Sequence, residues 1–279
     1  MNWMTEFLAK MMPMDASAHG PTLDRLNAYV HVLMLILFVF WGGYFLYVLW
    51  RFRAKNNPTS SYEGMRSHWS TSVEAGVAVI EVVLLIGFSI PAWKLWTSQP
   101  GKETNPLVIH MVAEQFAWNI HYPGPDGKFG RRDVSLVNAT NPLGLDPSDP
   151  DGKDDVAALN ELHVELNRPV IVHITSKDVI HSFFLPVMRV KQDAIPGMDV
   201  PIHFTPVKGN NGQQWDVACA QLCGLGHYRM RGMLFVDTKA EFDDWMASMA
   251  PVPEEPVPTP DANPVPEATP QNPPATTTG

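Results

Sequence analysis

Residues 29–50 are the feature that most limits how this chain can fold, because they run for 22 residues without a formal charge. A helix of about 20 apolar residues crosses the roughly 30 Å of a bilayer's hydrocarbon core. Tyr29 and Trp50 lie at the two ends, where aromatic side chains are common at membrane interfaces. Residues 73–93 form a second apolar run. The sequence therefore predicts two membrane-spanning helices.

The segment between the two runs predicts their orientation. It contains four bases, namely Arg51, Arg53, Lys55 and Arg66, and a single acid, Glu63. Short loops rich in Lys and Arg stay on the cytoplasmic side. The N-terminus and everything after residue 97 are then predicted to lie outside. We expect a multi-pass protein of a bacterial inner (plasma) membrane, with both termini and the outer domain on the periplasmic side.

The second run carries two acids, and an ionisable group inside a membrane span usually has a function or a partner. Glu74 lies near the start of its helix, where it would either stabilise the helix N-terminus or take part in a proton path. Glu81 lies two turns deeper and, being seven residues away, shares the same helix face. That face is predicted to pack against another membrane subunit.

After residue 106 the pattern changes to short alternating segments that indicate strands. Eight or so short strands over about 130 residues predict an antiparallel sandwich or barrel. A segment rich in Asp, Gly and Pro (124–155) has no EF-hand spacing and is interpreted as a solvated hairpin extension. The predicted strands are 107–113, 114–122, 161–166, 169–175, 179–185, 200–205, 214–218 and 232–237, followed by a short helix at 241–249.

These segments predict four regions. They are an N-terminal extramembrane segment (1–28), a two-helix transmembrane hairpin (29–97), an outer domain (98–250) and a proline-rich disordered tail (251–279). The chain has 29 Asp and Glu against 20 Lys and Arg, a net charge of −9. This acidic balance argues against nucleic acid as a partner.

The only two cysteines lie in a twelve-residue stretch, C-A-Q-L-C-G-L-G-H-Y-R-M. Cys219, Cys223 and His227 recur every four residues, and Met230 follows. A disulfide, a zinc site, a thiol redox pair and a copper site are all open at this point, since a disulfide is permitted outside the cytoplasm. One turning loop would point the two thiols and the imidazole inward.

A fourth strong ligand is expected from another strand, and His181 is the best choice because its apolar strand would bury it. The remaining outer-domain histidines are interpreted as structural: His110, His121, His163, His173 and His203. A Cys2His2 set can hold structural zinc, but zinc leaves Met230 without a role. A one-copper site uses one thiolate, so this loop has one too many. Two coppers bridged by both sulfurs would use every donor.

The chain resembles subunit II of the haem–copper cytochrome c oxidases over most of residues 25–250. The loop is similar to that family's Cys-x-Glu-x-Cys-x-x-x-His-x-x-Met motif for a dinuclear copper centre. The resemblance implies a fold of two transmembrane helices followed by a cupredoxin-like Greek-key β-barrel or sandwich. It also implies three partners for this chain: the haem-bearing subunit I of the oxidase, the other oxidase subunits and the lipid membrane.

The same resemblance assigns ligands. Cys219 and Cys223 would bridge two copper ions, and His181 and His227 would bind one each. Met230 and the backbone carbonyl of Gln221 would be axial ligands. Gln221 stands where the family usually has Glu, a position that also contributes to a magnesium site at the interface with subunit I.

The implied activity is that of the electron-accepting subunit of cytochrome c oxidase. Electrons from a soluble cytochrome c would pass through copper to haem in subunit I, where oxygen is reduced to water, coupled to proton translocation. Residues 100–250 hold 19 acids and 13 bases, an excess that would steer a basic cytochrome c.

Three further residues take roles from the resemblance. The stretch Q-F-A-W (115–118) is similar to the family's Gln-Trp-Tyr-Trp patch, which makes Phe116 and Trp118 the expected points of electron uptake; the alternative is that both rings only pack the barrel. Glu74 matches a glutamate near the mouth of a proton path.

Several other protein classes share part of this pattern. Quinol oxidase subunit II lacks the copper ligands, and nitrous-oxide reductase lacks the membrane hairpin. A membrane-anchored copper chaperone or a structural zinc protein remains as the alternative.

Overall fold

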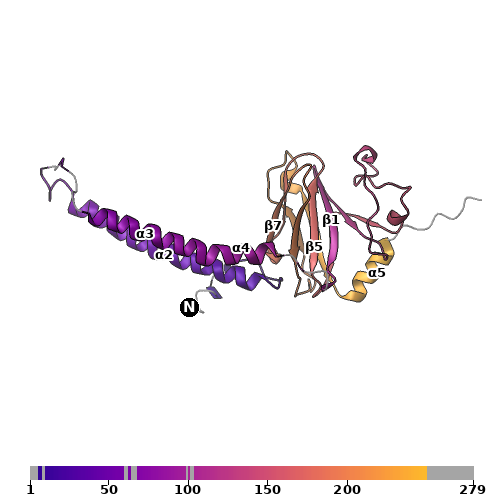
Figure 1. Cartoon of the computed structure of the whole chain (residues 1–279), viewed down its shortest axis with the longest axis horizontal. Coiled ribbons are helices and arrows are strands. Elements are labelled where there is room, and N and C mark those ends of the chain that lie inside the picture. Colours follow the sequence, from indigo (N-terminus) through magenta and orange to yellow (C-terminus); the bar gives the residue numbers. More distant parts are fainter. Residues whose placement is uncertain are drawn as a thin grey trace, which may run out of the picture.

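The computed structural model describes residues 6–7, 10–59, 62–63, 68–98, 100 and 104–249. The chain forms a β domain and a pair of long helices that extend from one end of it (Figure 1). The predicted fold class is confirmed. The proline-rich tail predicted at 251–279 lies outside the described residues, and the division at residues 28, 97 and 250 stays a prediction.

Among the described residues, two helical segments are long and apolar enough to cross a membrane, Gly20–Arg51 and Trp69–Lys94. The first is α2 (Gly20–Arg51), and the second spans α3 (Trp69–Leu84), a π-helical turn (Leu85–Ser89) and the first part of α4 (Ile90–Thr97). In Figure 1, α2 leads away from the β domain and α3 with α4 returns to it. The predicted spans, 29–50 and 73–93, lie within these longer helices. Their apolar side chains are largely exposed in the single chain, as expected for surfaces that contact lipid or partner subunits.

The β domain consists of two five-stranded sheets that enclose one hydrophobic core. The first sheet has the order β3-β2-β1-β5-β8, and the second has the order β4-β10-β9-β6-β7. The strands are β1 (Leu107–Glu114), β2 (Ala117–Tyr122), β3 (Val156–Leu159), β4 (Glu161–Glu165), β5 (Val170–Ser176), β6 (His181–Leu185), β7 (Val190–Ala194), β8 (Val200–Phe204), β9 (Trp215–Cys219) and β10 (Arg231–Asp237).

The predicted antiparallel sandwich or barrel is mostly antiparallel but also contains two parallel strand pairs. Strand β1 pairs with β5 in parallel, and β10 pairs with β4 in parallel. Alternation of apolar and polar residues shows which face of a strand is buried, but it does not show the direction of the neighbouring strand. The remaining pairs are antiparallel.

Two strands, β3 and β7, were not predicted from the sequence. Strand β3 has only four residues, two of them alanine, which has a weak preference for strands. Strand β7 reads V-K-Q-D-A, and only Val190 and Ala194 are buried. The predicted C-terminal helix is present as α5 (Lys239–Met249), and its Trp245 packs on Tyr122 with a ring-centroid distance of 5.1 Å.

The segment 124–155 forms an extension that packs on β1 through Phe129, whose ring stacks on His110. Its carboxylates are used within the extension: Asp133 accepts the backbone N–H of Ser135 at 2.8 Å, and Asp146 accepts that of Ser148 at 2.9 Å. Asp155 is buried and accepts the backbone N–H of Gly130 at 2.8 Å. These acids hold turns, which agrees with the interpretation of an extension and not a calcium loop.

The residues before α2 are fixed to the β domain, which the sequence analysis did not foresee. Ala16 donates its N–H to the Val187 carbonyl at 2.8 Å and accepts the N–H of Val207 at 2.7 Å. Arg189, in the left-handed conformation at φ 53°, donates Nε to Asp24 at 2.8 Å. The Arg189 side chain is only 9% exposed, so this ion pair is largely shielded from water. It connects the start of the first membrane helix to the β domain.

The ion pair predicts a specific loss of stability in the variant Asp24→Ala. The substitution leaves the Arg189 guanidinium partly buried without its carboxylate, and losing a hydrogen bond to a charged group costs about 1.5–3 kcal/mol. Asp243→Ala is the control, because the Lys239–Asp243 pair is exposed on α5 and exposed ion pairs contribute little to stability. Chemical unfolding of the full chain in detergent measures both. Equal losses would show that the pair does not anchor the helix.

Candidate metal centre

Strand pairing brings together the two chain segments that carry the predicted ligands. His181 is the first residue of β6, and Cys219 is the last residue of β9. These strands are antiparallel neighbours, with Phe183 opposite Cys219 and Phe184 opposite Ala218. His181 therefore lies beside the loop that leaves β9. Its side chain is fully buried, as the apolar strand predicted.

The loop between β9 and β10 folds back on itself through short-range hydrogen bonds. The N–H of His227 donates to the Gly224 carbonyl at 3.1 Å, and the N–H of Met230 donates to the His227 carbonyl at 3.2 Å. Cys219 donates its N–H to the Met230 carbonyl at 3.3 Å, which closes the loop. The two ends of the loop, eleven residues apart in sequence, thus lie side by side.

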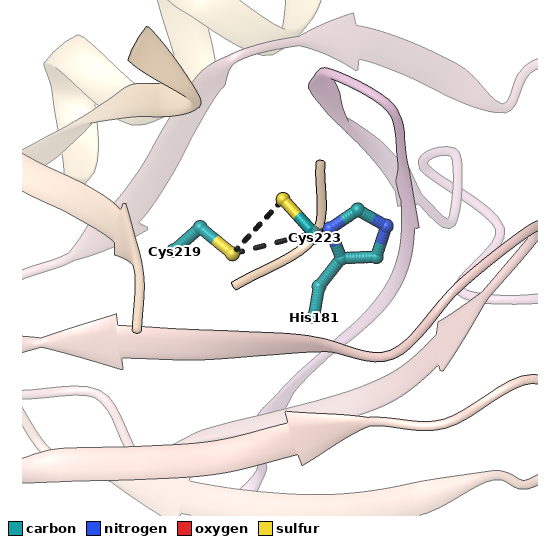
Figure 2. A group of neighbouring side chains, drawn as sticks. All are labelled: His181, Cys219 and Cys223. Atoms are coloured by element: carbon teal, nitrogen blue, oxygen red, sulfur yellow. Dashed lines mark hydrogen bonds between the residues drawn. The ribbon is translucent and has the colours of Figure 1, made fainter. Parts of the chain in front are cut away.

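All six predicted donors lie in one cluster. The Cys219 Sγ lies 3.8 Å from the Cys223 Sγ and 3.9 Å from the His181 Nδ1, and Figure 2 shows both contacts as dashed lines. The Cys223 Sγ lies 3.6 Å from the His227 Nδ1 and 3.7 Å from the Met230 Sδ. The backbone carbonyl oxygen of Gln221 lies 3.2 Å from the Cys219 Sγ.

The two cysteines are free thiols, which excludes a disulfide in this structure. A disulfide joins sulfurs at about 2.05 Å, much closer than the 3.8 Å found here. Two metal–sulfur bonds of about 2.3 Å at a near-tetrahedral angle would instead span about 3.8 Å. The sulfur spacing therefore fits a metal ion held between both sulfurs.

The donor set also fits a soft metal. Two thiols, two imidazoles and a thioether converge, and both Cys223 and Met230 are buried. Soft sulfur ligands with imidazole suit copper and zinc, whereas magnesium and calcium prefer oxygen. Burial, together with the neighbouring Cys219, raises the pKa of the Cys223 thiol to about 11. Metal binding must therefore displace a proton from this sulfur.

The predicted ligands are contacted by two residues that the sequence analysis did not single out, Asp178 and Gln115. Asp178 Oδ1 lies 2.9 Å from His181 Nε2, so the carboxylate orients the imidazole and leaves Nδ1 facing the sulfurs. Gln115 donates its side-chain N–H to the Cys223 carbonyl at 2.6 Å. The signal for Asp178 was present in the sequence, as a carboxylate three residues before a predicted ligand.

The two aromatic residues expected at the point of electron uptake occupy different environments. Phe116 is half-buried in the β1–β2 turn, with the Arg229 guanidinium 5.9 Å from its ring centroid. Trp118 has no exposed surface, and its ring lies 6.3 Å from that of His181. A fully buried ring does not contact a soluble donor directly, and the role of Trp118 in electron uptake stays a prediction. Its observed contact is with the ring of His181.

Glu74 and Glu81 both lie on α3, one of the long helices that extend away from the β domain (Figure 1). Glu74 accepts a hydrogen bond from the Ser70 hydroxyl at 3.1 Å. The first turn of α3 contains no acidic residue, so Glu74 lies beyond the part of the helix where the N-terminal dipole acts. This position weakens the helix-end interpretation of Glu74.

The remaining histidines of the β domain lie away from the donor cluster. His110, His121 and His173 form a row across β2, β1 and β5, with ring centroids 5.8 and 5.4 Å apart. Phe129 of the extension stacks on His110 at 4.0 Å. His163 is stacked between Phe235 and Trp245. These contacts agree with structural roles.

Comparison with known proteins gives consistent similarities. Residues 107–236 match the family described as cytochrome C oxidase subunit II, periplasmic domain. The alternative cytochrome c oxidase subunit 2 of Bradyrhizobium diazoefficiens is 32% identical over 203 residues, which cover 72% of this chain and 70% of that one. Cytochrome c oxidase subunit 2 of Synechocystis sp. is 28% identical over 270 residues, covering 88% and 77%.

A solved structure was also found among the similar proteins. It is the periplasmic domain of subunit II of cytochrome oxidase (CoxB) of Bradyrhizobium japonicum, which is 30% identical. The match covers 51% of this chain and 92% of that one, with a TM-score of 0.37.

The histidine row predicts acid sensitivity of the β domain. Burial, together with the nearby charges of Arg132, His121 and His173, lowers the pKa of His110 to about 3. Between about pH 6.5 and pH 3, His110 is protonated in the unfolded chain but not in the folded chain. The free energy of unfolding therefore falls as the pH falls through this window, by at most about 1.4 kcal/mol per pH unit from this residue.

The variant His110→Gln removes this titration, so its free energy of unfolding should fall less steeply than that of the wild type between about pH 6.5 and 4. Urea unfolding at several pH values measures both slopes. Parallel slopes would mean that folded His110 accepts its proton as readily as the unfolded chain does.

Proposed function

This chain belongs to the cytochrome c oxidase subunit II family, and we propose that it accepts electrons one at a time from a soluble cytochrome c at a dinuclear copper centre. It delivers them to the haem of subunit I, where oxygen is reduced to water while protons are translocated. The convergence of His181, both cysteines, His227, Met230 and the Gln221 carbonyl carries this proposal. The chain is one subunit of the oxidase complex and does not reduce oxygen by itself.

The donors support copper over zinc. The Met230 thioether is buried and directed at the Cys223 sulfur, a position that a zinc site with four strong ligands does not require. When bound, the copper pair supplies a carrier that gains and loses one electron. In this proposal Cys219 and Cys223 would both hold the copper pair, and His181 and His227 would each bind one of the two ions.

The weaker ligands are Met230 and the carbonyl oxygen of Gln221, which already faces Cys219. The Gln221 side chain is exposed, so its amide oxygen is free to contribute to a magnesium site at the boundary with subunit I. An amide oxygen is a neutral ligand, and hard cations favour charged carboxylates. The proposed magnesium site is therefore weaker than one built on Glu.

The outer surface of the metal loop is suited to protein contact. Three large side chains on this surface are exposed to solvent: Leu222 (77%), Leu225 (97%) and Tyr228 (85%). Exposed apolar side chains so close together usually mark an interaction site. Phe116 reaches the surface beside this loop and is the proposed point of electron uptake. The acidic excess of the β domain would attract a basic cytochrome c at low ionic strength.

The two helical segments support the proposed topology. We place the loop with Arg51, Arg53 and Lys55 in the cytoplasm and the β domain in the periplasm of a bacterial inner membrane. In this arrangement residues 29–97 form the membrane hairpin, 98–250 the copper domain, and 1–28 and 251–279 the terminal regions outside the membrane. Glu74 then lies near the cytoplasmic side, where protons for oxygen reduction are taken up.

The copper centre predicts the metal content and colour of the full chain. Purified in detergent and reconstituted with copper, it should bind two copper ions and show the purple absorption of a mixed-valence pair. In Cys219→Ser the dinuclear centre should be lost or rearranged, because a hydroxyl does not replace a bridging thiolate. Absorption, electron paramagnetic resonance and metal analysis measure these properties.

The control for this experiment is Ala220→Ser, which adds a hydroxyl to an exposed position of the same loop and should leave the centre unchanged. A colourless wild-type chain with one zinc ion would favour the structural zinc protein, and transient, transferable copper would favour the chaperone. Two coppers and wild-type electron-transfer rates in Cys219→Ser would refute the bridging assignment.

A second prediction concerns Glu74 in the assembled oxidase. Glu74→Gln keeps an acceptor for the Ser70 hydroxyl but removes the titrating group. Loss of a proton-transfer group should slow turnover by about 10²-fold, while the copper spectrum stays unchanged. Ser70→Ala breaks the hydrogen bond and keeps the carboxylate, so it serves as the control with near-normal turnover. Normal turnover in Glu74→Gln would exclude the proton path.

A further inference from the structure

The metal ligands come from two segments whose backbone pairing ends at the site. Beyond the pair Phe183–Cys219, the last backbone bond between them runs from the Ala220 N–H to the Ser182 carbonyl at 2.9 Å. The loop then turns away to deliver Cys223, so strand pairing does not fix the distance between His181 and Cys223. Another element has to set this distance.

The β1–β2 turn contacts both segments through one residue, Gln115. Its backbone N–H donates to Asp178 Oδ2 at 2.7 Å, and the other oxygen of the same carboxylate lies 2.9 Å from His181 Nε2. Its side-chain Nε2 donates to the Cys223 carbonyl at 2.6 Å. Gln115 is thus joined to the imidazole segment by its backbone and to the thiolate loop by its side chain.

The β1–β2 turn packs closely on the metal loop at two glycines. A β-carbon on Gly226 would lie 2.4 Å from the Phe116 ring, and one on Gly224 would lie 2.8 Å from the Gln115 Nε2. Gly224 also has φ +134°, a conformation that other residues rarely adopt. Both glycines therefore allow the turn to lie directly on the loop, which keeps the Gln115 amide within hydrogen-bond distance of the Cys223 carbonyl.

We propose that Gln115 is a positioning residue that sets the distance between His181 and the thiolates before metal binds. This inference rests on the proposed metal centre, but it concerns residues that are not ligands. A site held in the geometry of the bound state needs less rearrangement on binding, and groups that orient ligands typically change metal affinity 10–100-fold when they are removed. Gln115 joins the two halves of this site in that way.

The variant Gln115→Leu tests the proposal in the full chain, because it keeps the side-chain volume approximately and removes the amide donor. Affinities for Cu(I) and for Zn(II) are measured by competition with a chelator. Both should fall about 10–100-fold relative to wild type, and the absorption band and reduction potential of the copper-loaded chain should shift. Gln214→Leu is the control, since Gln214 is exposed and outside the metal site, and it should match wild type in every measurement.

Thermal unfolding of the metal-free variants separates positioning from general stability. A lower melting temperature with unchanged affinities, band and potential would overturn the proposal. If Gln115→Leu does not fold, Gln115→Asn, whose shorter amide cannot reach the Cys223 carbonyl, is measured in the same way. The wild-type copper content decides the proposed function, whereas the ratio of variant to wild-type affinity decides this inference for either metal.

Discussion

The antiparallel pairing of β6 with β9 is the contact on which the proposed metal centre depends. It places the first residue of one strand, His181, beside the last residue of the other, Cys219. The closed loop after β9 then needs only eleven residues to return three more side chains and one carbonyl to the same point. The centre is therefore formed at the end of a sheet, where the sandwich supplies rigidity and the loop supplies the donors.

Much of this arrangement could be predicted from the sequence because the motif is local. Cys219, Cys223, His227 and Met230 share one loop, and their spacing alone brings them together. Strand β7 and the parallel pairs were not predictable in the same way, since they depend on tertiary contacts that alternation does not encode. The contact of Gln115 with the metal loop was also not predictable, because Gln115 lies more than one hundred residues before the Cys223 carbonyl that it binds.

The aromatic residues show a different limit of sequence interpretation. Phe116 and Trp118 are two positions apart on the β1–β2 turn and strand, yet one reaches the surface and the other is enclosed. A sequence motif identifies aromatic residues near the site. Only their burial in the structure distinguishes a ring that can contact a partner protein from a ring that packs against a candidate ligand. Asp178 gives the converse case, in which a common polar residue acquires a role through the imidazole that it orients.

The attachment of Ala16 and Asp24 to the β domain has a consequence for biogenesis. These residues precede their partners Val187, Arg189 and Val207 by more than 160 residues in the chain. During translation the first helix is therefore synthesised well before its anchor, and the full set of contacts can form only after residue 207 has been made. Closure of this contact requires most of the β domain, and a chain truncated before residue 186 would keep both long helices but lack every one of these partners.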